Sequence, residues 1–448
     1  MPGATPTQNS ATAPTLSPHF PRLQGQGLAV SVLHYAYTQL LDTYVDTIDD
    51  RQLISGGIAG LRNDLNGQPL LPIVTLAADL VPDPTGETEK DFQALAEAYE
   101  SISTKLPAWS ANAHPDWAVL RGMAESLHDG HTTFLTPDEA RRRSETSFAG
   151  IGVLLSRPQD DQAPLITEVL PSSPALQSGI KRGDRIVAVD GQSMVGLSLA
   201  DVAAQIRGPV GSDVHLTLRR ASSDKPLEIT LHRAQVEVDP VIVGVIPQTR
   251  IGYLRVRNFG DQSVADRALS ALIAGRQGGV AAWIIDLRGN TGGQLAAVAE
   301  LAAGLVDDAH KTIGYRVDRL RRHSPLEVRQ GLALTQGLPV VLLVDRDTAS
   351  GAEILAAALQ EGKFAELVGS KTAGSVGVAT QVQLPDDSVL QITEQRFISP
   401  SNALLDGVGV TPDDVVEMTD ADYENDRDPQ LKKAGQILVQ KLTGTTGG

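Results

Sequence analysis

The feature that most constrains the fold of this chain is an alternation of apolar runs and helical patterns between residues 250 and 420. The runs IGYLRV, AAWIIDL and LPVVLLVD predict strands, and helical spacing follows each one at about 262–274, 294–305 and 350–359. Alternation of this kind favours a mainly parallel sheet whose faces are covered by helices. We therefore predict a multi-domain α/β chain with an α/β core over residues 236–420.

The rest of the chain differs from this core in its patterning. Residues 27–147 carry apolar residues at three- and four-residue steps, which predicts an N-terminal helical domain. Residues 148–235 contain short β-rich runs between Gly, Pro and Asp turns, which predicts one small β module. Residues 421–448 predict a C-terminal helix and tail. Residues 1–26 are rich in Pro, Ser and Thr, and we expect a flexible leader there.

Composition excludes several classes of function. The 448 residues include 38 Lys and Arg against 54 Asp and Glu, and a net charge of −16 argues against binding of nucleic acid. No apolar run approaches the ~20 residues that cross a bilayer, so we expect no transmembrane segment. The absence of Cys excludes disulfides, thiol catalysis and thiolate metal sites.

Two predicted strands end in unusual residues, and ligands gather beyond the carboxyl ends of such strands. One end reads DLRGNTGG from Asp286 to Gly293, and the other reads DTASGAE from Asp347 to Glu353. Ser350 is either the N-cap of the following helix or a nucleophile, and the residues by themselves favour the cap. As a nucleophile it would use the amides of Gly351 and of Gly292 or Gly293 to stabilise an oxyanion.

A catalytic serine needs a base, and His131 is the candidate among nine histidines. It lies in the short polar turn LHDGHT after an apolar helix, where a capping or surface histidine is equally reasonable. His128 and His131 lack a third ligand with suitable spacing, so we expect no metal site. The GNTGG turn lacks the G-x-G-x-x-G fingerprint, and we expect no cofactor.

Several motifs in order resemble the carboxyl-terminal processing, or tail-specific, serine peptidases, a family with a PDZ domain. The resemblance covers roughly residues 28–65 and 120–445. It is carried by the following stretches: Asp129–Thr132, Phe134–Pro137, Phe148–Val153, Ser173–Gly179, Gly183–Ile186, Asp286–Gly293, Thr348–Glu353 and Gly407–Asp413. Single stretches are weak signals, but their common order is specific, and it reverses the preference at Ser350 from cap to nucleophile.

The resemblance implies roles for particular residues. Ser350 would attack a peptide carbonyl, and Gly351 with Gly292 or Gly293 would form the oxyanion hole. The module at 148–235 would be PDZ-like and would hold the C-terminus of a protein or peptide substrate. Successive amides there can bind a carboxylate, while the peptide adds to the sheet as a strand. The residues that offer these amides are Gly150, Ile151, Gly152 and Val153.

The chain departs from the family pattern at the catalytic base. Processing peptidases commonly use a Ser–Lys dyad with the lysine 25 positions after the serine, and Ser375 stands at that position here. Lys371 is an alternative base, provided that its ammonium turns inward and is buried. Tricorn-like relatives use a Ser–His pair, which favours His131 as the base, with Asp129 or Glu353 as the acid that orients its ring.

Two functions therefore remain open from the sequence. The first is a serine endopeptidase that cleaves proteins or peptides near their C-termini. The second is an inactive pseudopeptidase that binds C-terminal peptides or regulates a partner. A homo-oligomer and an adaptor protein are further partners that the sequence leaves open. The leader and the family predict an extracytoplasmic location in the periplasm or at the cell surface, and residues 66–120 are an insertion relative to the family.

Overall fold

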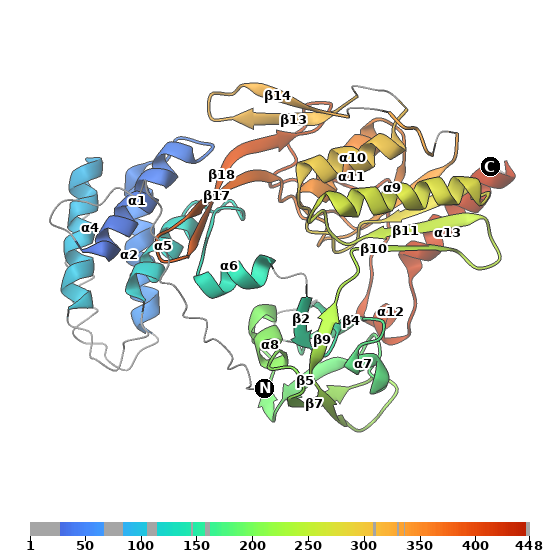
Figure 1. The fold of residues 1–448 in the computed structure, drawn as a ribbon, viewed down its shortest axis with the longest axis horizontal. Helices are drawn as coiled ribbons and strands as arrows, with labels where there is room; N and C mark the ends of the chain where they lie inside the picture. The colour runs from blue at the N-terminus through green and yellow to red at the C-terminus, as the bar shows by residue number, and fades with distance from the viewer. Residues whose placement is uncertain are drawn as a thin grey trace, which may run out of the picture. The chain divides into compact units, whose positions relative to one another are not determined.

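In a computed structural model the chain forms two compact units (Figure 1). Unit 1 comprises residues 1–144, 316–324 and 377–396, and unit 2 comprises residues 145–315, 325–376 and 397–448. The structure describes residues 27–66, 84–104, 114–144, 147–156, 162–307, 311–328, 331–335 and 337–444. The predicted leader at 1–26 lies outside the described residues, as do parts of the insertion at 66–120.

Unit 1 is built from helices and a small antiparallel β structure. Strands β1 and β17 both pair with β18, whose last residues belong to unit 2. Apolar side chains from all of its long helices and from β18 form one core, including Leu33, Leu53, Leu95, Leu120 and Leu390. The elements are α1 (Leu28–Thr43), α2 (Asp50–Asn66), α4 (Thr88–Ser103), α5 (Pro115–Glu125), β1 (Thr133–Leu135), α6 (Pro137–Ser144), β17 (Gly377–Gln383) and β18 (Val389–Ile398).

The β module of unit 2 contains a six-stranded sheet in the order β3-β4-β5-β7-β8, with β6 beside β5. The Ser198 hydroxyl accepts a hydrogen bond from the Asp201 N–H at 3.1 Å and so caps the start of α8. Strand β2 pairs with β9. The elements are β2 (Ser147–Gly150), β3 (Val153–Ser156), β4 (Leu165–Val169), α7 (Pro174–Gln177), β5 (Arg185–Val189), β6 (Gln192–Ser193), α8 (Leu199–Ile206), β7 (Asp213–Arg219), β8 (Leu227–His232) and β9 (Ala234–Glu237).

The second sheet of unit 2 runs in the order β10-β11-β12-β15-β16-β19, with every neighbouring pair parallel except β10 and β11. Its strands contribute alternate residues to two cores, as the two-residue period of a strand requires. Its elements are β10 (Val241–Val245), β11 (Ile251–Val256), α9 (Gln262–Gln277), β12 (Ala282–Asp286), α10 (Leu295–Leu305), β15 (Val340–Val344), α11 (Gly351–Glu361), β16 (Glu366–Gly369), β19 (Asp414–Val415), α12 (Asp420–Glu424) and α13 (Pro429–Thr443).

Helices cover both faces of this sheet (Figure 1). On one face Leu254, Ile285 and Leu342 pack against α9, α10 and α11. On the other face Ile284 and Leu343 pack against α13. The strands are therefore buried on both sides, which explains their continuous apolar sequences. Strands β13 (Thr312–Asp318) and β14 (His323–Glu327) each contribute residues to both units.

The predicted strands and helices of the core are confirmed, with small changes at their ends. Helix α9 extends three residues beyond its predicted end to Gln277. Helix α11 begins at Gly351, because Ser350 has a non-helical backbone. Strands β16, β17 and β18 were not predicted from the sequence. None of the helices in the described part of the chain is long and apolar enough to cross a membrane.

Glycines allow α2 and α5 to cross at close range in unit 1. A Cβ atom at Gly122 would lie 2.2 Å from the Gly56 carbonyl oxygen and 2.8 Å from the Gly60 Cα atom. Both contacts are with backbone, which cannot move aside as a flexible side chain can. The two helices would have to separate to accept a side chain at Gly122.

We expect Gly122→Ala to lower the free energy of unfolding by about 1–3 kcal/mol, because the added methyl group overpacks this crossing. Gly435→Ala in α13 is the matched control, since no atom lies within 4 Å of its Cβ position and alanine favours a helix. Urea denaturation followed by circular dichroism measures both variants. Equal stability of the Gly122 variant and the wild type would contradict the close crossing.

Candidate active site

Two neighbouring parallel strands bring the two unusual motifs together. Asp286 at the end of β12 is in register with Leu343 near the end of β15, so both strands finish at the same edge of the sheet. The loops that follow are joined by hydrogen bonds. The Ala349 N–H donates to the Asn290 carbonyl at 2.9 Å, and the Thr348 hydroxyl donates to the Leu287 carbonyl at 3.0 Å. The structure thus places the 286–293 turn beside the residues that lead to Ser350.

Ser350 has φ 53° and ψ −122°, a conformation that a residue with a side chain rarely adopts. Its backbone N–H donates to the Ser375 carbonyl at 2.8 Å and to the Glu353 carboxylate at 3.1 Å. Its carbonyl accepts the N–H of Glu353 at 2.9 Å, so backbone atoms supply this bond at the start of α11. Strain of this kind costs about 1–3 kcal/mol and is found mainly at functional sites.

The glycine pair lies against the Ser350 turn. A Cβ atom at Gly292 would be 2.6 Å from the Gly351 nitrogen and 2.7 Å from the Ser350 Cβ, so only glycine allows this approach. The two glycines differ in their hydrogen bonds. The Gly292 N–H donates to the Asn290 side-chain oxygen at 2.8 Å, whereas the N–H groups of Gly293 and Gly351 donate to no described residue. Gly293 and Gly351 are therefore the amides available to an oxyanion.

Glu353 is fully buried and connects the serine turn to a second loop. Besides the Ser350 N–H, its carboxylate accepts the Thr372 hydroxyl, the Gly374 N–H at 2.8 Å and the Ser375 N–H at 2.9 Å. A buried carboxylate needs such donors, because losing water is otherwise costly. The sequence suggested Glu353 as an acid that orients a histidine ring. The four contacts hold the 372–375 loop against the start of α11.

The position of the missing family lysine adjoins the serine. Ser375 accepts the Ser350 N–H through its carbonyl and donates its own N–H to Glu353. Lys371 is exposed in the structure, which is not the buried setting that its role as a base requires. Of positions 371 and 375, only position 375 is joined to Ser350 by a hydrogen bond among the described residues.

His131 belongs to unit 1, and Ser350 belongs to unit 2. The His131 Nε2 atom accepts the Gly377 N–H at 2.9 Å, and its carbonyl accepts the Gln391 side-chain amide at 2.7 Å. Asp129 accepts the N–H groups of His131 and Thr132 and so shapes this turn. Burial would raise the pKa of Asp129, but these hydrogen bonds and those of two threonine hydroxyls hold it below its usual range.

The predicted carboxylate-binding loop precedes the edge strand β3. The Ile151 carbonyl accepts the Ala175 N–H and the Gly152 carbonyl accepts the Leu170 N–H, both at 2.9 Å. The N–H groups of Ile151 and Gly152 donate to no residue in the described parts of the chain. Gly152 has φ 81°, and a Cβ there would lie 2.2 Å from the Ser173 Cβ. The loop thus directs its carbonyls inward and leaves its amides for a ligand.

Comparison with known proteins identifies the family. The model of Peptidase family S41 matches residues 250–416, and the PDZ domain model matches residues 141–219. A carboxyl-terminal-processing protease of Synechocystis sp. is 30% identical over 338 residues, which cover 73% of this chain and 78% of that protein. Another from Picosynechococcus sp. is 31% identical over 330 residues, which cover 71% and 78%. The chain belongs to the carboxyl-terminal-processing proteases.

The predicted membership of this serine peptidase family, a hydrolase class, is thereby confirmed. The solved structure of a photosystem II D1 C-terminal processing protease has a TM-score of 0.56 and 24% identity to this chain. It covers 88% of this chain, and 94% of that structure is matched, which shows a common fold. The predicted multi-domain α/β class with a PDZ domain is also confirmed.

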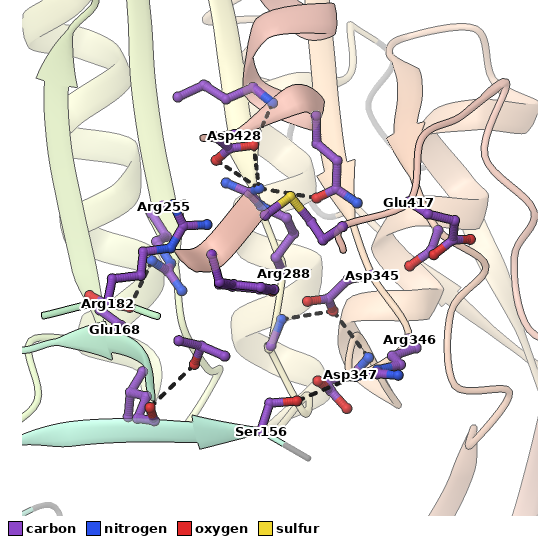
Figure 2. Close-up of a pocket in the computed structure, with 18 of the residues that line it drawn as sticks. Ser156, Glu168, Arg182, Arg255, Arg288, Asp345, Arg346, Asp347, Glu417 and Asp428 are labelled. Atoms are coloured by element: carbon purple, nitrogen blue, oxygen red, sulfur yellow. Dashed lines mark hydrogen bonds and ion pairs between the residues drawn. The ribbon is translucent and has the colours of Figure 1, made fainter. Parts of the chain in front are cut away.

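A cavity of about 660 Å³ lies between the PDZ domain and the second sheet of unit 2 (Figure 2). This sheet, β10-β11-β12-β15-β16-β19, is called the catalytic sheet of this processing protease because the peptidase family model covers most of it. The end of β3, the loop after β12 and the loop after β15 line the cavity, together with α12 and the start of α13. Arg346 donates to the Ser156 hydroxyl at 3.3 Å and so links the β15 loop to β3. The cavity therefore adjoins both the PDZ domain and the loop that ends at Ser350.

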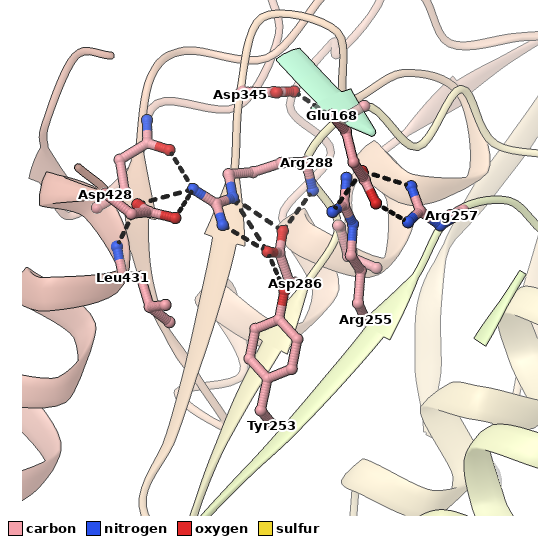
Figure 3. A network of polar contacts seen from close by, with 12 residues as sticks. Glu168, Tyr253, Arg255, Arg257, Asp286, Arg288, Asp345, Asp428 and Leu431 are labelled. Carbon is pink, nitrogen blue, oxygen red and sulfur yellow. Dashed lines mark hydrogen bonds and ion pairs between the residues drawn. The ribbon is translucent and has the colours of Figure 1, made fainter. Parts of the chain in front are cut away.

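A chain of charges joins the PDZ domain to the 286–293 turn (Figure 3). Glu168 of β4 pairs with Arg257, and with Arg255 at 2.9 Å. The Asp286 carboxylate accepts the Tyr253 hydroxyl at 2.8 Å and the Arg288 guanidinium at 2.6 Å. Arg288 in turn reaches Asp428 at 2.9 Å before α13. Arg288 thus ties the 286–293 turn to Asp286 at the end of β12 and to Asp428 before α13.

Several residues that build this site were not predicted from the sequence. Glu168, Arg255 and Arg257 carry no motif, because their partners are distant along the chain. Glu353 was noted only as an acid, although its position three residues after Ser350 is the spacing of a capping box. That spacing is the signal that could have predicted its contact with the Ser350 N–H.

The contacts of Asp286 predict how the stability of the folded state depends on pH. Burial would raise the pKa of Asp286, but the guanidiniums of Arg288 and Arg255 outweigh it and lower the pKa from 3.8 to about 2. A carboxyl group whose pKa is lowered by folding stabilises the folded state at pH values above its pKa in the unfolded chain. This stabilisation is lost as the pH falls from about 4 towards 2.

We therefore expect Asp286→Asn to be less stable than the wild type at pH 7, with the difference shrinking between about pH 4 and pH 2. Urea denaturation at pH 7, 4, 3 and 2.5 measures the two free energies of unfolding. Asp261→Asn, which changes an exposed helix cap, is the control for a general effect of removing one carboxylate. A difference that stays constant across the series would contradict the assignment.

Proposed function

We propose that this processing protease is a serine endopeptidase that binds the C-termini of proteins or peptides and cleaves them nearby. The observation that carries the proposal is the strained Ser350 turn packed against Gly292, with the Gly293 and Gly351 amides available. Such amides stabilise the charge that develops on a carbonyl oxygen during attack, which is the largest catalytic contribution in many hydrolases. Ser350 is the nucleophile in this proposal.

The PDZ domain supplies the binding of the substrate's C-terminus in this proposal. The amides of the loop from Gly150 to Val153 receive the terminal carboxylate, and the free edge of β3 pairs with the peptide. The substrate is a protein or peptide, and no cofactor takes part. We further propose an extracytoplasmic location, which rests on the composition of residues 1–26 and on the family.

His131 is the base in this proposal. A neutral imidazole has one lone pair, and the His131 Nε2 atom uses it to accept the Gly377 N–H. This hydrogen bond has to open, or the tautomer has to change, before Nε2 can receive the proton of Ser350. A histidine still needs less adjustment than an exposed lysine to act near neutral pH.

We expect Ser350→Ala to lower the rate of cleavage by at least about a thousandfold, because the nucleophile is lost. His131→Ala should lower it about a hundredfold or more, and Lys371→Ala should not. Casein and a peptide with a free C-terminus serve as substrates, and a fluorophosphonate should label the wild type but not Ser350→Ala. Peptide binding without cleavage or labelling, from pH 5 to 10, would make the chain a binding protein instead.

We also expect Ser375→Lys to restore cleavage in the His131→Ala background, because the backbone of residue 375 already contacts Ser350. Activity should appear on the alkaline side of neutrality, since lysine must lose its proton to act as a base. The pH profile of kcat/KM distinguishes this rescue from residual activity. Gln381→Lys on β17 is the control for a general effect of added charge. Failure of the rescue would indicate that a side chain at 375 does not reach the hydroxyl.

A further inference from the structure

Strand β3 is an edge strand of the PDZ-domain sheet, so a peptide can pair with it. The inference rests on the proposed function, in which the terminal carboxylate binds the loop before β3. Strand β3 begins at that loop and runs away from it. A peptide whose C-terminus is bound at the loop therefore pairs with β3 in the antiparallel direction. Its last residue then lies beside Val153, and its fourth residue from the end lies beside Ser156.

The two faces of β3 have different surroundings. Val153 and Leu155 pack against the core of the PDZ domain. Leu154 and Ser156 point to the opposite face, since side chains alternate along a strand. The register with β4 shifts between Leu154 and Leu155, but Thr167 on β4 is the extra residue, so the alternation along β3 is kept.

The second face is directed towards the catalytic sheet. Glu168, paired with Leu154 across the two strands, contacts Arg255 of β11 and Arg257 just after it. The Ser156 hydroxyl accepts a hydrogen bond from Arg346. Residues directly opposite each other in an antiparallel pair extend to the same side. The fourth peptide residue from the end therefore projects its side chain to the side of Arg346.

Arg346 has the chemistry to recognise that side chain. It lies on the loop between β15 and α11, four residues before Ser350, and is exposed to the cavity (Figure 2). Its guanidinium makes one bond to Ser156 and forms no ion pair with any described residue. The planar guanidinium carries five N–H groups that match a carboxylate. We propose that Arg346 selects substrates with an acidic residue at the fourth position from the C-terminus.

Asp347 also lines the cavity and would favour a basic residue instead. Arg346 is the residue whose side chain contacts β3, through Ser156, so it lies nearer to the peptide edge. Its loop ends at the proposed nucleophile. Recognition by Arg346 would thus make the substrate contact the peptidase loop as soon as its C-terminus is bound.

The test measures binding to the full chain carrying Ser350→Ala, so that no peptide is cleaved. Fluorescein-labelled decapeptides ending in Xaa-Ala-Ala-Val, with Glu, Gln or Lys at Xaa, are titrated and followed by anisotropy. We expect Glu to bind about two- to fivefold more tightly than Gln, the range of an exposed ion pair, and Lys to bind most weakly. Arg346→Ala should remove these differences, and Arg346→Glu should reverse them.

Two controls test the register and the charge. Peptides with the charge at the third position from the end should not respond to Arg346→Ala, because that side chain faces the PDZ core. Arg322→Ala, an exposed arginine on the β13–β14 turn, should leave the Glu preference unchanged. Thermal denaturation checks that each variant is folded.

Either of two results would overturn the inference alone: binding of all peptides with no dependence on Arg346, or a preference for Lys in the wild type. Failure to bind any peptide, or equal binding of peptides with amidated C-termini, would remove the proposed clamp and the inference together. The two kinds of failure are therefore distinguishable within one titration series.

Discussion

The buried carboxylate of Glu353 is the interaction on which the geometry of the site depends. It is removed from water, and its four donors come from the start of α11 and from the 372–375 loop. One charge therefore fixes the backbone of Ser350 and the segment that carries Ser375. The strained conformation of Ser350 persists because these contacts and the register of β12 with β15 hold it from several directions.

A second set of charges, most of them partly buried, connects this centre to the PDZ domain. Glu168 belongs to the strand next to the peptide-binding edge, and its arginine partners lie on β11 of the catalytic sheet and directly after that strand. Asp286 and Arg288 continue the alternation of charge into the glycine turn. The domain that is proposed to bind the C-terminus and the turn that is proposed to bind the oxyanion thus share one electrostatic framework, joined also by the Arg346 contact to Ser156.

The fold was predicted well where the signal is local. Apolar runs identified β11, β12 and β15, and helical spacing identified α9, α10 and α11, because burial on both faces leaves a direct mark on the sequence. Strands β17 and β18 were not recognised, since half or more of the residues in each are not fully buried and their pairing partners lie far along the chain or are themselves unrecognised strands. The site was predicted as a set of residues, but the contacts of Glu353 and Arg346 were not.

The sequence by itself determined which residue types stand at which spacing: the serine and glycine motifs, the histidine turn, and the serine at the usual lysine position. Those features identified the family because motif order is written along the chain. Only the tertiary structure decided that the Asn290 side chain accepts the Gly292 N–H and leaves the Gly293 N–H available to a ligand. It also decided that Lys371 is exposed. The reason is physical: hydrogen-bond partners and burial are set by segments that meet in space, and no local pattern encodes them.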